Sequence, residues 1–80
     1  MRYTVVLVPD ERDGGYVAYV PAIPGCVTQG DTLDDAIAMA QDAAEGMLAV
    51  MAEHGEDLPT EPDGAVVARV NVAIPMLAPA

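Results

Sequence analysis

The chain has 80 residues, of which 13 are acidic, three are arginine and none is lysine, so its formal net charge is −10. This length fits one small domain, residues 1–80, whose core alone gives a stability on the order of 3 to 5 kcal/mol, so a second subunit is the expected support. Because this charge repels nucleic-acid phosphates, we expect no direct binding of DNA or RNA and an attraction to basic partners.

Three short strands are expected in the first thirty residues. YTVVLV, residues 3–8, is rich in β-branched side chains and stops at Pro9. The Pro, Asp and Gly residues of 9–15 predict a turn, so YVAYV at 16–20 should form a hairpin with the first strand. PAIPG predicts a bend, and CVTQ at 26–29 is the third strand.

One helix is expected to follow, from a cap at Thr32 to a stop at Gly55. Thr32 and Asp35 form a T-x-x-D pattern close to a capping box. Apolar residues recur at threes and fours and predict one buried stripe: Ile37, Ala40, Ala44, Met47, Leu48 and Met51. Gly46 would weaken the helix, which suggests a close approach to the sheet at that position.

A fourth strand is expected near the C-terminus, after a polar loop. Residues 65–74 alternate, with Val66, Ala68, Val70, Val72 and Ile74 on one side and Arg69 and Asn71 on the other. The order β-β-β-α-β predicts an α+β domain with two layers. One helix would cover one face of a mainly antiparallel sheet, with the last strand beside the first.

The single helix can cover only one face of this sheet. The other face would expose Val6, Val8, Val17 and Tyr19, and a contiguous apolar patch of this kind is typical of an interface. We therefore predict that these four residues form a partner or oligomer interface, and that the chain is a homo-oligomer. The alternative is that the turn at 10–15 and the C-terminal tail partly cover them.

The sequence contains no recognisable catalytic, cofactor-binding or metal-binding constellation. Cys26 and His54 are too far apart for a nucleophilic pair and too few for a zinc site. The acidic residues of the predicted helix fit a solvated face. No apolar stretch reaches the roughly 20 residues of a membrane span, and the lone cysteine suits a reducing cytoplasm. We expect a cytoplasmic protein that is not an enzyme and needs no cofactor.

The stretch YVAYVPAIPGCVTQGDTLDDAIAMAQDA, residues 16–43, resembles the N-terminal domain of the HicB antitoxin family, and the likeness extends over residues 3–58. The resemblance implies a partly eroded ribonuclease-H-like fold without its catalytic carboxylates. It also implies an antitoxin that masks the RNA-cleaving surface of a small basic HicA-like toxin. The acidity of the chain suits such a partner.

Family members often carry a C-terminal DNA-binding segment, whereas this sequence ends at IPMLAPA, so direct operator binding is not expected. Two alternatives stay open. One is a stand-alone oligomeric module with another protein or a small molecule as partner. The other is a metal-dependent nuclease, which would need acidic residues on two strands as well as on the helix, where Asp35 and Asp42 are the candidates.

Overall fold

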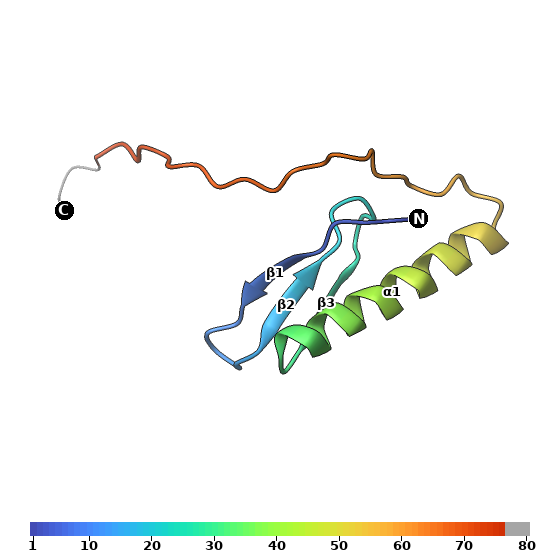
Figure 1. Cartoon of the computed structure of the whole chain (residues 1–80), viewed down its shortest axis with the longest axis horizontal. Helices are drawn as coiled ribbons and strands as arrows, with labels where there is room; N and C mark the ends of the chain where they lie inside the picture. Colours follow the sequence, from blue (N-terminus) through green and yellow to red (C-terminus); the bar gives the residue numbers. More distant parts are fainter. Residues whose placement is uncertain (77–80) are drawn as a thin grey trace.

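The computed structural model describes residues 1–76, which form a three-stranded sheet, one helix and a long C-terminal tail (Figure 1). The elements are β1 (Val6–Pro9), β2 (Tyr16–Tyr19), β3 (Val27–Gly30) and α1 (Leu33–Glu53). Both strand pairs are antiparallel, and the sheet order is β1-β2-β3. The prediction of an α+β fold with one helix on one face of an antiparallel sheet is therefore confirmed.

The turn between β1 and β2 closes the expected hairpin. The Asp10 N–H donates to the Gly15 carbonyl at 2.9 Å, and the Gly14 N–H donates to the Asp10 carbonyl. Gly15 has a φ of +74°, and a Cβ at this position would collide with the backbone of Gly30. Only glycine combines this backbone angle with so close a neighbour.

The PAIPG bend between β2 and β3 is an ordered part of the core. The Val20 N–H donates to the Cys26 carbonyl at 3.0 Å, and further bonds join Ile23 to both of these residues. Ile23 is 1% exposed and is the largest fully buried side chain of the described residues. The bend therefore fills the core as well as reversing the chain.

The helix begins where the sequence predicts, but its buried stripe is rotated slightly. The Thr32 hydroxyl accepts the Asp35 N–H at 3.0 Å, which confirms the cap. The buried helix residues are Ala36, Ala40 and Ala44. Ile37, which was predicted to lie in the stripe, is 42% exposed. The small alanines let α1 lie close to the sheet, and the larger Ile37 is left at the margin of the contact.

The close approach between helix and sheet is at Gly30, and not at Gly46 as predicted. A Cβ at Gly46 would meet open space, whereas a Cβ at Gly30 would collide with the backbone of Ala36. Gly30 ends β3 and α1 begins at Leu33, so the tight turn between them brings Gly30 against the backbone of Ala36. The periodicity of the helix alone carries no information about such a turn.

The predicted fourth strand is absent from the described part of the chain. Residues 65–76 are extended and exposed, and Figure 1 shows them running past the sheet without joining it. The prediction of a fourth strand is wrong for these residues, because an alternating segment forms a strand only when its backbone pairs with another strand. In this chain the tail does not reach an edge of its own sheet, so β-β-β-α replaces the expected β-β-β-α-β.

Candidate functional site

The four residues predicted to form an interface lie together on the face of the sheet that α1 does not cover. Leu7 pairs with Ala18, and Ala18 is fully buried in the cluster formed with the helix alanines. Because successive strand side chains point to opposite faces, the neighbouring residues face away from the helix. The register then sets two cross-strand pairs on that side, Val6 with Tyr19 and Val8 with Val17.

The third strand adds one apolar residue that the sequence analysis missed. Val27 pairs with Tyr19 across β2 and β3 and is 54% exposed. We call the surface formed by Val6, Val8, Val17, Tyr19 and Val27 the open face. The short CVTQ segment alternates, but its sequence does not show which β2 residue faces Val27. The sequence therefore does not place Val27 on the same side as Tyr19. Val8 and Tyr19 are also more than two-fifths exposed, so the open face is accessible.

An acidic hollow lies at one end of the sheet, beside the start of α1. It is lined by nine residues, four of which are aspartates: Asp10, Asp13, Gly14, Gln29, Gly30, Asp31, Asp35, Ala38 and Met39. The Asp10 carboxylate already accepts the N–H groups of Arg12 and Asp13 at 3.0 and 3.2 Å, so it holds the turn. Within residues 1–76, no three His, Cys, Asp or Glu side chains are grouped to hold a metal ion.

Cys26 and His54 lie in different parts of the fold, one buried and the other exposed. Cys26 is buried in the core with 3% exposure. His54 is an exposed residue that ends α1, where its N–H donates to the carbonyls of Val50 and Met51. The structure thus brings together the predicted interface residues and does not bring together a nucleophile and a base.

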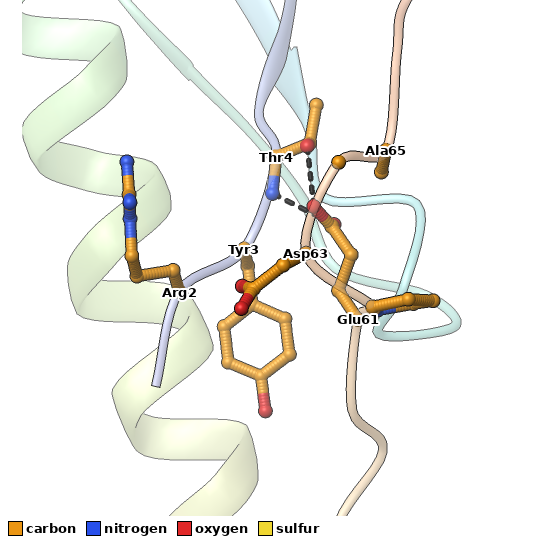
Figure 2. A pocket seen from close by; sticks show the side chains of 8 residues that line it. Arg2, Tyr3, Thr4, Glu61, Asp63 and Ala65 are labelled. Atoms are coloured by element: carbon orange, nitrogen blue, oxygen red, sulfur yellow. Dashed lines mark hydrogen bonds between the residues drawn. The ribbon is translucent and has the colours of Figure 1, made fainter.

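A group of hydrogen bonds holds the segment that follows the helix against the residues before β1 (Figure 2). The Glu61 carboxylate accepts the Thr4 N–H at 2.8 Å and the Thr4 hydroxyl at 2.5 Å. Both bonds stabilise the ionised carboxylate and lower the pKa of Glu61 below its ordinary value of 4.5. The bond from the Thr4 hydroxyl has the larger effect, and the bond from the Thr4 N–H has the smaller one. The Tyr3 hydroxyl also donates to the Pro59 carbonyl at 2.6 Å. We call these three bonds the Glu61 anchor.

Comparison with known proteins identifies the family. Residues 3–72 match the family described as the HicB-like antitoxin of bacterial toxin-antitoxin systems. The chain belongs to the HicB-like antitoxin family. The match includes residues 65–72, where the resemblance read from the sequence is looser than over residues 3–58.

Relatives with similar sequences differ in length. A UPF0150 protein of Thermoplasma acidophilum is 41% identical over 61 residues, covering 76% of this chain and 87% of that protein. A UPF0150 protein of Synechocystis is 43% identical over 66 residues, which covers 82% of it. Antitoxin HicB 1 of Photorhabdus laumondii is 44% identical over 59 residues, and the match covers only 37% of that relative.

The described residues contain no helix that is long and apolar enough to cross a membrane.

Proposed function

We propose that this chain is an antitoxin-type binding module, and that it neutralises a small basic RNA-cleaving toxin by covering the toxin's active surface. The proposal rests on the open face, an apolar surface on the side of the sheet away from α1. Contiguous exposed apolar surface of this kind usually marks a protein interface. Membership of the HicB-like antitoxin family supports an antitoxin role.

The charge of the chain favours a basic partner. A toxin that cleaves RNA needs a positively charged surface to bind phosphates. A chain of net charge −10 is attracted to that surface and competes with RNA for it. The acidic hollow lies beside Gln29 at the border of the open face, so apolar and acidic surface meet there. We propose that the HicA-type class of toxin is the partner.

We propose no catalytic role for the chain itself. Its buried cysteine and exposed histidine lie on different parts of the fold. Asp10 holds the turn, and Asp34 and Asp35 lie in the first turn of the helix. A binding module needs only a surface that fits its partner, and the open face supplies one. A ribonuclease-H-like ancestry would be consistent with a sheet and helix that no longer carry a carboxylate site.

A second candidate is a stand-alone oligomeric module that binds another protein or a small molecule. The short UPF0150 relatives favour it, since this chain matches more than four-fifths of the Thermoplasma and Synechocystis proteins. The neighbouring gene separates the two candidates. A small basic reading frame with a catalytic histidine beside this gene supports the toxin partner.

The experiment co-expresses this chain with that neighbouring protein and measures copurification at low and at high salt. Tyr19→Asp places a charge in the open face and should abolish copurification. Val50→Asp is the control, because Val50 is similarly exposed but lies on α1. The complex should also weaken as salt rises. Equal binding by the Tyr19 and Val50 variants would exclude the open face as the toxin-binding surface.

A further inference from the structure

The C-terminal tail is an extended apolar segment without a packing partner in the described structure. Val66, Val70, Val72 and Ile74 are between 74% and 84% exposed. The tail lengthens the molecule to 55 × 27 × 26 Å, and the radius of gyration is 16.3 Å. A compact chain of 80 residues would have a radius of gyration of about 12 Å. So much exposed apolar surface indicates that the tail packs against something else.

The side chains of the tail alternate as those of a half-buried strand do. Val66, Val70 and Val72 share one side, together with Ala68 and Ile74, and the other side carries Val67, Arg69, Asn71 and Ala73. The segment contains no proline between positions 65 and 74, so its backbone can donate and accept hydrogen bonds along its whole length. A sheet edge with an apolar surface beside it would cover the side that carries Val66, Val70, Val72 and Ile74 and leave Arg69 and Asn71 on the other side.

The outer edge of β1 is such an edge. The bond from the Asp10 N–H to the Gly15 carbonyl fixes which residues face β2. Because hydrogen bonding alternates along an antiparallel pair, Val6 and Val8 bond to β2. The backbone groups of Val5 and Leu7 then point outward, away from the sheet. β1 is the first strand in the order β1-β2-β3, so this edge is unpaired within the described residues.

A mainly apolar groove lies on the helix side, beside the residues that lead into β1. α1 packs mainly on β3 and β2 and reaches β1 least. A cavity of about 520 Å³ is left between the segment that leads into β1 and the helix. Its lining includes the apolar Tyr3, Val5, Ile37 and Leu48 and the polar Gln41 and Glu45. A strand paired with the outer edge of β1 would place every second side chain into this groove. The exposed Ile37 and the exposed valines of the tail would then cover each other.

The course of the tail directs it away from the edge of its own β1. Tyr3 and Val5 pack on the helix side, so Thr4 between them faces the open-face side, where Glu61 binds it. Residues 65–67 then lie beside Pro21 and Ala22, past the end of β2. Pro62 and Gly64, which has a φ of +88°, lie at the turn that precedes them. A short constrained connection of this kind favours exchange of the segment between two molecules.

We propose that residues 66–72 of one copy add as a strand to the outer edge of β1 in a second copy, with the valine side in the groove, and that the exchange is reciprocal. The dimer leaves the open face of each copy free. The inference goes beyond the proposed function and does not depend on any toxin.

The test compares Val70→Asp with Asn71→Asp in the full chain. Both variants add one carboxylate to the tail, but only the first would place it in the groove. Native mass spectrometry should give a dimer for the original chain and for Asn71→Asp, and a monomer for Val70→Asp. A dissociation constant raised roughly tenfold or more is the expected effect of a charge in an apolar site. A monomeric original chain, or equal effects of the two variants, would refute the exchange.

A second measurement identifies the strand that the tail meets. In a mixed dimer of isotopically labelled and unlabelled chains, intermolecular NMR contacts should join residues 66–72 to Val5 and Leu7. Contacts only within one chain would mean that the tail pairs with its own β1, and the proposal would be wrong. Dissociation of the dimer by Tyr19→Asp would also overturn it, since the open face would then be the dimer interface.

Discussion

Glu61 and Thr4, which are 57 positions apart in the sequence, are joined by two hydrogen bonds to one carboxylate. Together with the bond from Tyr3 to Pro59, they attach the segment after the helix to the beginning of β1. The two ends of the folded region are thereby held together, and the tail leaves the sheet from a fixed point (Figure 2).

The Glu61 anchor should be sensitive to pH. The pKa of Glu61 is lowered in the folded chain, so its contribution to stability is fully present above the ordinary value of 4.5. The contribution is lost as the pH falls through the lower folded pKa. NMR signals of Tyr3 and Thr4 should therefore change below pH 4.5 as residues 59–64 loosen, while those of β2 stay constant.

The variant Thr4→Val tests the cause of this shift. It removes the hydroxyl, which has the largest effect on the pKa of Glu61, and keeps the backbone N–H. The pKa of Glu61 should rise toward 4.5, as measured by titration of its carboxyl carbon. Thr60→Val, at an exposed neighbouring position, is the control and should leave the titration unchanged. An unshifted pKa in Thr4→Val would mean that the hydroxyl does not hold the carboxylate.

Removal of the helix cap should destabilise the fold measurably. Thr32→Ala deletes the hydroxyl that accepts the Asp35 N–H, and a lost cap of this type costs about 1 kcal/mol. Urea unfolding followed by circular dichroism gives the free energy of unfolding. Thr60→Ala, in the exposed loop, should stay within about 0.5 kcal/mol of the original chain. Equal stabilities of the two variants would count against the cap.

The two glycines at 30 and 46 should respond in opposite directions to the same substitution. Gly30→Ala forces a methyl group against the backbone of Ala36, which should cost about 1 to 3 kcal/mol. Gly46→Ala adds a methyl group in open space within a helix, which should stabilise the chain by about 0.5 to 1 kcal/mol. Thermal unfolding gives the midpoint temperature of each variant, which should fall for Gly30→Ala and rise for Gly46→Ala. A change of the same sign in both midpoints would contradict the described packing.

The sequence predicts those parts of the fold that local chemistry determines. The Thr32 cap, the hairpin turn at Gly14 and Gly15, and the alternation in β1 and β2 all act within a few residues, and each was predicted close to its observed place. The side shared by Val6, Val8, Val17 and Tyr19 follows from that alternation. Its role as an interface stays a prediction.

What the sequence does not predict depends on how distant segments meet. Val27 joins the open face only through the β2–β3 register, and Gly30 matters only because Ala36 turns back over it. The anchor between Thr4 and Glu61 has no local signature. The tail shows the same limit, since its alternating pattern indicates a strand but does not specify the strand with which it pairs.

The layer of alanines between helix and sheet has a consequence for how such a protein can change over time. Ala18, Ala36 and Ala40 are fully buried, so any larger side chain there must push α1 away from the strands. Ala40 also borders the groove beside β1. A single substitution at this hidden position would therefore alter the width of the groove, and with it the proposed strand exchange, without any change on the surface.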